Sequence, residues 1–459
     1  MVQNTLGKLW LRNKPGSGLK ALMPYYLESP SETTDTYLKL TSPQELTLLD
    51  PAAGSGHILV YAFELLAHIY EEEGYSRTDI PSLILQHNLM GFDIDERAAQ
   101  LASFTLTMKA RQYDRRFFRR NVQPRVVALH KLEHTTPADW QPVLADADVA
   151  LTDTLRADLT LMTQADNLGA LIRPETGDAT LQQAADTLNT YARQSSDLFR
   201  KPLAEDLSKA LEHLMLLAYK RTCVVANPPY MGGGAMNATL STFVKKYYPD
   251  SKADLMACFM ERGLSLCQPS GYLSMINQHS WMFLGSYEDL RKKLIDTILI
   301  DTLLHLGPRT FPEIGGEVVQ NAAFTFQNQT YAEPPAGHYV RLVDLKNTTE
   351  KAANVTNAAL TYHARQDNFE KIPGEVIGYW LSDRVLNIFI DEDSLKEHLQ
   401  SSVGMQTGNN NEFLRSWNEV SYSKINTSAA SGHDFKVKKW APCHKVEKLK
   451  NGMEITTLL

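Results

Sequence analysis

One segment constrains the fold of this chain more than any other: residues 48–57, Leu-Leu-Asp-Pro-Ala-Ala-Gly-Ser-Gly-His. An apolar run there leads into a glycine turn, and a long helical pattern follows from Ile58 to Glu73. Strand, glycine turn and helix start are typical of the nucleotide-binding opening of a doubly wound sheet. The segment therefore predicts a Rossmann-like α/β fold with a ligand site at the carboxyl end of this strand.

Three ligand chemistries compete for this turn. A phosphate-binding loop needs Gly-Lys-Ser/Thr at the helix start, where the chain has His57-Ile58. A dinucleotide fingerprint needs a third glycine, and Leu59 occupies that place. S-adenosylmethionine needs neither, because it has no phosphate; it needs a close backbone approach and an acid near its amino group. The residues of the turn predicted to bind this cofactor are Asp50, Pro51, Ala52, Gly54 and Gly56.

A second strand, predicted over Asn88–Asp95, also ends in acidic residues. A carboxylate that accepts hydrogen bonds from two vicinal ribose hydroxyls makes a charge-assisted, bidentate contact. Asp93 is the better candidate for that contact, with Ile94 lying against the adenine face. Asp95 suits the N-cap of a helix that starts at Glu96.

A third apolar run, Thr222–Ala226, leads into Asn227-Pro228-Pro229-Tyr230 and then into three glycines. A β-branched run that ends in a proline pair indicates a buried parallel strand whose carboxyl end opens into a loop. An amide oxygen beside a proline carbonyl suits an exocyclic amino group, and the aromatic ring suits a flat heterocycle. The motif therefore predicts a pocket for methylating an amine on a base or a planar amide. The alternative is a rigid Pro-Pro turn with a packed Tyr, which the glycine turn makes less favoured.

Taken together, these motifs resemble those of amino-group DNA methyltransferases of the N6-adenine type. More narrowly, the chain is similar to the PglX-type methyltransferases of BREX phage-defence systems, over nearly its whole length to about residue 445. The segments that carry the narrower resemblance are 6–11, 59–66, 70–75, 280–284 with 286–288, and 403–408. Asn-Pro-Pro-Tyr alone is shared with enzymes that methylate protein glutamine.

The chain also departs from that family. Members have a Cys where Ala53 stands, which is an exchange of small residues that should leave cofactor binding intact. They are more than twice as long, and a Phe-Thr-Pro motif precedes their counterpart of Leu6–Leu11. From Val446 the sequence changes character, where family members continue into a DNA-recognition region. A truncated or frameshifted form of the family is therefore expected.

The resemblance implies site-specific methylation of adenine N6 in double-stranded DNA, with S-adenosylmethionine as methyl donor. Asn227 and the Pro228 carbonyl would accept the two amino N–H bonds, while Tyr230 would stack on a base flipped out of the duplex. Other BREX proteins are possible partners. Two alternatives stay open: a methyltransferase that acts on protein glutamine or cytosine N4, and a truncated, inactive binding module of the defence complex.

Charge gives little support for DNA binding, because the formal net charge is −7. Affinity would then need a local patch, and Lys245-Lys246, just beyond the Asn-Pro-Pro-Tyr loop, are the preferred candidates for phosphate contact. A second basic stretch is interleaved with aromatic residues and is interpreted as a solvated helix face over an aromatic stripe. Its basic residues are Lys109, Arg111, Arg115, Arg116, Arg119, Arg120 and Arg125.

Along the chain, residues 1–330 are expected to form the methyltransferase domain, with a helical insertion at about 140–217. Within the insertion, Asp166 is preferred to Asp153 as the acid that contacts the cofactor's adenine amino group. Strands are expected near 271–276, 298–306 and 318–326, the last of them a possible antiparallel edge. Residues 331–459 are expected to be a connector and the truncated beginning of the recognition region, with a boundary near Pro334-Pro335.

Composition excludes several other classes. The four cysteines lack a metal-ligand spacing, which favours a reducing cytoplasm over a disulfide framework. The pairs Cys443-His444 and His130/His134 lack partners, so no metal is predicted. No apolar stretch approaches the roughly 20 residues of a membrane span.

Overall fold

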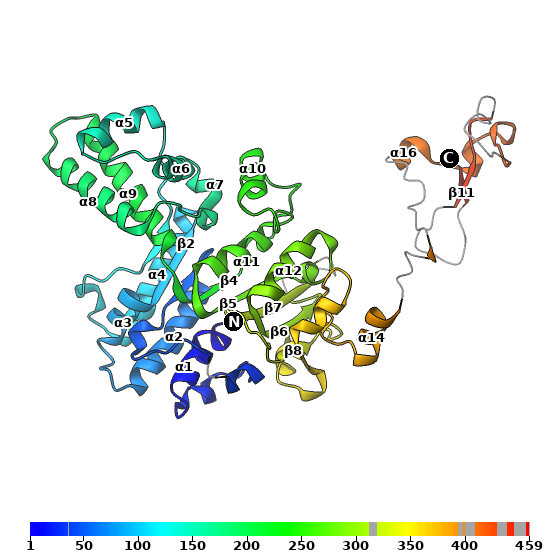
Figure 1. Ribbon diagram of the computed structural model, residues 1–459, viewed down its shortest axis with the longest axis horizontal. Coiled ribbons are helices and arrows are strands. Elements are labelled where there is room, and N and C mark those ends of the chain that lie inside the picture. The colour runs from blue at the N-terminus through cyan, green and yellow to red at the C-terminus, as the bar shows by residue number, and fades with distance from the viewer. Residues whose placement is uncertain are drawn as a thin grey trace. The chain divides into compact units, whose positions relative to one another are not determined.

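The computed structural model describes residues 1–34, 36–311, 319–392, 398–399, 409–428, 438–444 and 456–458. It divides into two compact units, Met1–Asp391 and Glu392–Leu459 (Figure 1). Residues 403–408, one of the segments that carry the PglX resemblance, lie outside the described residues.

A nine-stranded mixed sheet forms the centre of the first unit, in the order β3-β2-β1-β4-β5-β7-β6-β8-β9. Its strands are β1 (Leu48–Asp50), β2 (Leu89–Asp93), β3 (Val126–Ala128), β4 (Arg221–Ala226), β5 (Cys267–Gln278), β6 (Leu299–Gly307), β7 (Asn321–Gln327), β8 (Gly337–Arg341) and β9 (Thr361–Ala364). Strands β3, β2, β1, β4 and β5 run parallel to one another, whereas β7 is antiparallel to both of its neighbours. The predicted Rossmann-like α/β fold is confirmed.

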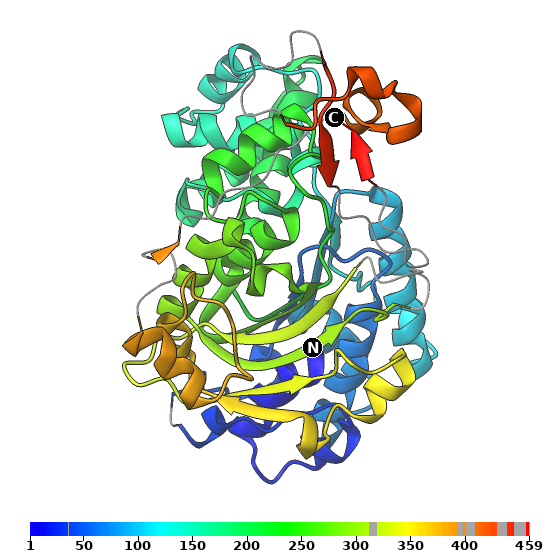
Figure 2. The ribbon, with the colours of Figure 1, turned by 90° about the vertical axis from the view of Figure 1, so that its right-hand side faces the viewer.

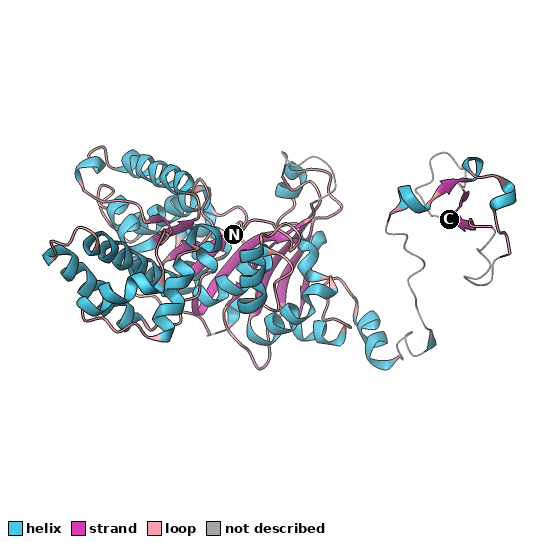
Figure 3. Ribbon diagram, turned by 90° about the horizontal axis from the view of Figure 1, so that it is seen from above, coloured by secondary structure: helices cyan, strands magenta, loops and turns pink. Residues whose placement is uncertain are grey.

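Both faces of the sheet are covered by helices, as Figure 3 shows. In β4, Val224 and Ala226 pack into one hydrophobic core, and Cys223 and Val225 pack into the other. A parallel strand buried on both faces is apolar throughout rather than alternating, which explains the continuous apolar run before Asn227. The helices around the strands are α1 (Leu6–Asn13), α2 (His57–Glu72), α3 (Ile80–Leu83), α4 (Glu96–Tyr113), α10 (Ala238–Tyr247), α11 (Leu255–Leu266) and α12 (Glu288–Thr297).

Helix α1 is fastened to a strand far along the chain. The buried ammonium of Lys8 lies 2.5 Å from Oδ2 of buried Asp301 in β6, and Ser29 Oγ donates to the Asp301 carbonyl at 3.2 Å. Figure 2 shows the blue N-terminal helices against the yellow-green strands of the same unit. The N-terminal segment is thus part of the sheet's covering layer.

The segment predicted as a helical insertion lies between β3 and β4. Its helices are α5 (Pro137–Asp146), α6 (Asp153–Met162), α7 (Ala165–Leu168), α8 (Asp178–Gln194) and α9 (Arg200–Ala218). Helices α8 and α9 pack along each other, and Ser208 Oγ of α9 donates to the Ala185 carbonyl of α8 at 3.0 Å (Figure 1).

Two expectations about the later strands differ from the structure. Strand β7 is antiparallel, but it lies between β5 and β6 instead of at an edge, because its buried Phe324 and Phe326 need a covered position. The sheet also continues past residue 331, because fully buried Tyr339 and Val340 of β8 pair beside β6. Pro334-Pro335 therefore belong to a loop within the first unit, and the division falls at 391/392.

Beyond β8, the first unit contains α13 (Thr348–Ala353), the edge strand β9 and α14 (Asp383–Asp391). The second unit has α16 (Asn410–Phe413) and a small antiparallel sheet in the order β10-β12-β11, formed by Arg415–Ser416, Thr456–Leu458 and Pro442–His444. Among the described helices, none has the length and apolar character that a membrane crossing needs.

Candidate functional site

Three neighbouring parallel strands place the predicted site residues at one edge of the sheet. Strand β1 lies between β2 and β4 and ends at Asp50, while β2 ends at Asp93 and Asn227 follows the last residue of β4. Carboxyl ends of parallel strands meet at the same edge, where open α/β sheets bind their ligands. The structure therefore brings together three motifs that are far apart in the sequence.

The glycine turn after β1 is attached to the end of β2 by its backbone. Ala53 N donates to the Phe92 carbonyl at 2.8 Å, and Gly54 N donates to Asp93 Oδ2 at 2.7 Å. Both turn glycines have positive φ angles, +52° at Gly54 and +83° at Gly56. These hydrogen bonds fix the glycine turn against Asp93 at the end of β2.

The two glycines differ in what surrounds them. A Cβ at Gly56 would lie 2.8 Å from Cβ of Ala102, so α4 packs directly on the backbone there. A Cβ at Gly54 would meet nothing within 4 Å. The turn therefore has close helix packing behind Gly56 and an open approach at Gly54, which fits a cofactor that contacts the backbone.

Asp50 is a buried carboxyl, with only 1 % of its surface exposed. Its Oδ1 accepts a hydrogen bond from Ala52 N at 3.1 Å. Burial raises the pKa of Asp50 to about 7, and the charge of Asp93 acts in the same direction. A cation at this carboxyl would offset both effects, so the residue suits the amino group or the sulfonium of S-adenosylmethionine.

Asp93 accepts two backbone hydrogen bonds, because its Oδ1 also receives Asp95 N at 2.9 Å. The adjacent Ile94 is 57 % exposed, so its apolar side chain is accessible to a planar ligand. Asp95 caps α4 by accepting from Arg97 N at 2.8 Å, which confirms its predicted structural role.

The loop after β4 presents its residues unequally. Asn227 and Pro229 are exposed, Pro228 is buried, and Tyr230 is half-buried. The Tyr230 hydroxyl donates to the Ile276 carbonyl of β5 at 2.9 Å and accepts from Asn321 Nδ2 of β7 at 3.2 Å. The ring is thus fixed by two strands and is not simply packed on its own turn.

Burial raises the pKa of the Tyr230 hydroxyl to about 12. The phenol consequently stays neutral at physiological pH. Its oxygen lies 3.5 Å from Asn227 Oδ1, so the phenol and the amide belong to the same small polar group. This chemistry favours a ring that supports a planar ligand over a phenolate that removes a proton.

Asp254 binds the loop after β4, a role that could not be identified from the sequence. Its buried carboxylate accepts from Met231 N and from Met256 N, both at 3.0 Å, so one oxygen joins the loop to the start of α11. Leu255 N donates back to the Met231 carbonyl at 3.0 Å. An Asp directly before a helical pattern signals an N-cap, but no local pattern shows that it also binds a distant loop.

Asp166 lies on α7, where its Oδ2 is 2.9 Å from Lys131 Nζ. A Cβ on Gly169 would be 2.7 Å from Ile94 Cγ2, so the segment after α7 passes directly over the end of β2. The competing Asp153 is in the first turn of α6. The position of the α7 segment is compatible with Asp166 near the adenine end of a cofactor.

Lys245 and Lys246 are exposed in the last turn of α10, and Lys246 Nζ lies 3.0 Å from Tyr247 Oη. The other basic stretch is partly neutralised within the fold. Lys109 pairs with Glu64, and Arg120 with Asp114. The interpretation of this stretch as a largely structural helix face is compatible with these pairs.

The fold and this edge of the sheet define a protein of the Rossmann-like, S-adenosylmethionine-dependent methyltransferase class. Residues 87–311 match the family model of the Eco57I restriction-modification methylases. The chain is similar to PglX-type adenine-specific methyltransferases over almost its whole length, as its motifs predicted.

Two relatives show this similarity. The adenine-specific methyltransferase BrxX of Escherichia coli O9:H4 (strain HS) is 38 % identical over 97 % of this chain and 39 % of its own length. The adenine-specific methyltransferase PglX of Lacticaseibacillus casei (strain Zhang) is 36 % identical over 97 % of this chain and 38 % of its own. This chain therefore spans about two fifths of the length of these relatives.

Among solved structures, the ATP-dependent type ISP restriction-modification enzyme LlaBIII bound to DNA matches 74 % of this chain and 21 % of that chain. Sequence identity is 12 % and the TM-score is 0.46. So distant a likeness adds nothing to the assignment of function.

Proposed function

We propose that this chain is the methyltransferase part of a site-specific adenine-N6 DNA methyltransferase. The observation that carries the proposal is the convergence of Asn227, Asp50 and Asp93 at one edge of three adjacent parallel strands. The relatives named as adenine-specific methyltransferases support the choice of base.

The exposed Asn227 would accept one N–H of the adenine amino group, and the Pro228 carbonyl would accept the other. These two bonds localise the nitrogen lone pair, which is otherwise delocalised into the ring and weakly nucleophilic. Tyr230 would stack on the base after it has left the duplex. Alignment of the amine with the methyl group then supplies the rate enhancement, and the proton released from nitrogen passes to solvent.

S-adenosylmethionine, when bound, supplies an electrophilic methyl group on a sulfonium. We propose that Asp93 holds its ribose hydroxyls, Asp50 its cationic end and Ile94 its adenine face. The backbone of the turn, with the open position at Gly54, would allow the close approach. The remaining proposed contacts are Pro51, Ala52 and Gly56 in the turn and Asp166 beside the adenine amino group.

Asp254 would act as a positioning residue, because its carboxylate ties the loop that carries the amide to α11. Double-stranded DNA is the proposed partner, with Lys245 and Lys246 as candidate phosphate contacts. The relation to PglX extends the proposal to other BREX proteins as partners and to the cytoplasm as the location. Residues 392–459 would belong to the connection with a DNA-recognition region.

Methyl transfer from radiolabelled S-adenosylmethionine to DNA tests the proposal directly. Label in N6-methyladenine is expected from the wild-type chain, and none from Asn227→Ala, while cofactor affinity measured by calorimetry stays unchanged. Label in cytosine N4 or in protein glutamine would show that this group, and not adenine N6, is the substrate. Wild-type turnover by Asn227→Ala would remove the residue from the site.

Asp93→Ala is the complementary variant, because it should weaken cofactor binding, which Asn227→Ala leaves unchanged. Loss of a charged hydrogen-bonding partner costs roughly 1.5–3 kcal/mol, which weakens cofactor affinity by about 10- to 150-fold. Unchanged calorimetric affinity would contradict the ribose assignment. A folded wild-type chain that binds no cofactor would instead support the alternative of a binding module without activity.

A further inference from the structure

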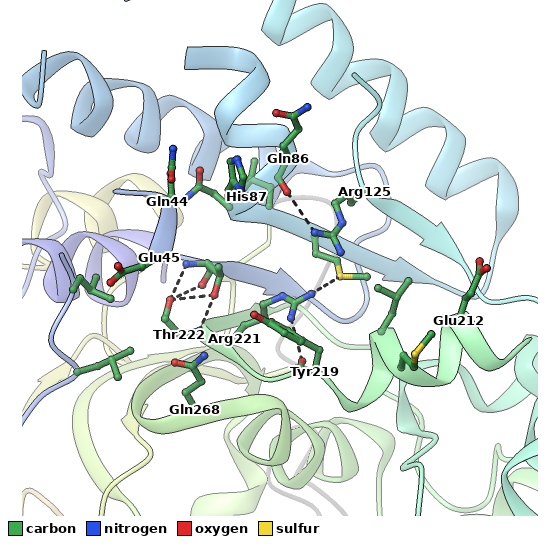
Figure 4. Close-up of a pocket in the computed structure, with 18 of the residues that line it drawn as sticks. Gln44, Glu45, Gln86, His87, Arg125, Glu212, Tyr219, Arg221, Thr222 and Gln268 are labelled. Carbon is green, nitrogen blue, oxygen red and sulfur yellow. Dashed lines mark hydrogen bonds between the residues drawn. The ribbon is translucent and has the colours of Figure 1, made fainter. Parts of the chain in front are cut away.

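A cleft lies at the end of the sheet opposite to Asn227. It has a volume of about 930 Å³ and opens where five parallel strands begin (Figure 4). Residues at or next to those strand starts line it: Thr47, Leu89, Arg125, Arg221 and Gln268. Because the proposed transfer site is at the carboxyl ends of the same strands, the cleft is separate from it.

Two guanidinium groups reach into this cleft. Arg221, the first residue of β4, is only 4 % exposed and lies 3.9 Å over the ring of Tyr219. It donates to the Tyr219 carbonyl at 3.4 Å and contacts Met90 Sδ at 3.0 Å. Arg125 is exposed and donates to the Gln86 carbonyl at 3.4 Å. Figure 4 shows the two side chains pointing into the same part of the cleft.

Neither arginine forms an ion pair with a carboxylate in the part of the chain that the structure describes. The two carboxylates that line the cleft are engaged elsewhere: Glu45 accepts from Thr41, and Glu212 accepts from Asn189. Burial and the neighbouring charge of Arg125 lower the pKa of Arg221 to about 10, which leaves it protonated at neutral pH. A buried cation without a counter-charge is costly unless an anion joins it.

The remaining lining is polar and suited to a heterocycle. The ring of Tyr219 is 55 % exposed beside the guanidinium. Amide side chains of Gln44, Gln86 and Gln268 line the same cleft and offer both donors and acceptors. The volume lies within the range of about 300–1,000 Å³ typical of small-molecule sites.

We propose that this cleft binds a nucleoside phosphate, with Arg221 and Arg125 holding the phosphate and the glutamine amides facing the base. Guanidinium groups bind phosphate oxygens in a planar, bidentate manner. Arg221 and Arg125 are available for such a contact, because neither is paired with a carboxylate in the part of the chain that the structure describes. The nucleoside phosphate could be a free nucleotide or the terminal nucleotide of a nucleic-acid strand. Both sources present the same chemistry to the cleft.

Calorimetric titration of the full chain with three probes tests this site: inorganic phosphate, ADP and a single-stranded oligonucleotide with a 5′-phosphate. Arg125→Gln removes an exposed charge from the cleft without disturbing the core. Arg119→Gln is the matched control, because Arg119 is also exposed and lies outside the cleft. We expect Arg125→Gln to weaken ADP binding about tenfold or more, and Arg119→Gln to change it little.

The outcomes separate the possibilities. Binding of ADP identifies a free nucleotide, and binding of the oligonucleotide alone identifies a strand end. ADP bound no more tightly than inorganic phosphate would overturn the nucleoside assignment. No binding of any probe at millimolar concentration, or equal losses in both variants, would overturn the site. Affinity for S-adenosylmethionine is expected to be the same in the wild-type chain and in both variants.

Discussion

At the scale of single residues, the site depends on carboxylates placed in three different environments. Asp50 is buried with one backbone donor, Asp93 is half-buried with two, and Asp254 joins a loop to a helix. Burial raises the pKa of Asp50 to about 7, and burial also raises the pKa of Asp254. The three acids are therefore suited to different tasks, although they are the same residue type.

Asp50→Asn should separate cofactor affinity from stability. If the Asp50 carboxylate holds a cationic group, affinity of the wild-type chain rises from about pH 6 to about pH 8, as the group ionises through its pKa of about 7. The Asn variant should bind weakly and with little pH dependence over that interval. Calorimetry at a series of pH values measures both. A parallel pH dependence in the variant would show that another group titrates.

The same substitution has a predictable effect on folding. The pKa of Asp50 is raised on folding from its ordinary 3.8 to about 7, so the native state holds this proton more tightly than the unfolded state does. Stability therefore falls as pH rises from about 4 to about 7 and stays reduced above that. Asp50→Asn should raise the melting temperature at about pH 8 and leave it nearly unchanged at about pH 4. An unchanged melting temperature of Asp50→Asn at about pH 8 would show that the buried charge of Asp50 does not destabilise the fold.

At the scale of elements, the residues at which the strands end could be predicted from the sequence. The order of the strands in the sheet and the contacts between distant segments could not. Apolar runs that stop at Asp50, Asp93 and Asn227 are local patterns, so these candidates could be identified without a structure. The interior position of β7 depends on pairing with strands on both sides, which no local pattern encodes. The same applies to the second role of Asp254, because its partner Met231 lies in another segment.

Substitutions in the glycine turn test how that element works. Gly54→Ala and Gly56→Ala both place a side chain at positive φ, at a cost of roughly 1–2 kcal/mol each. Gly56→Ala should cost more, because its Cβ would lie 2.8 Å from Ala102 Cβ in α4. Gly54→Ala has open space and should mainly reduce cofactor affinity. Thermal melts and cofactor titrations of both variants check this; equal melting temperatures would contradict the packing argument.

At the scale of the whole molecule, the sheet defines where the first unit ends. Strand β8 pairs with β6 through residues 338–341, and its Tyr339 and Val340 are fully buried. The composition after residue 331 is polar and irregular, so the sequence suggested a boundary there. Two short strands inside a polar stretch give little periodic signal, although the buried side chains of β8 complete the core.

This division predicts different behaviour for two fragments. Residues 1–391 retain all nine strands of the sheet and should unfold cooperatively on heating, with the same affinity for S-adenosylmethionine as is measured for the full chain. Residues 1–330 would leave β6 with an unpaired edge and remove the buried side chains of β8. Unpaired strand edges promote association between chains, and the loss of core contacts lowers stability. The shorter fragment should therefore aggregate or melt at a lower temperature, measured by circular dichroism and light scattering. Equal melting temperatures for the two fragments would show that β8 and β9 add nothing to the fold and would restore a boundary near residue 331.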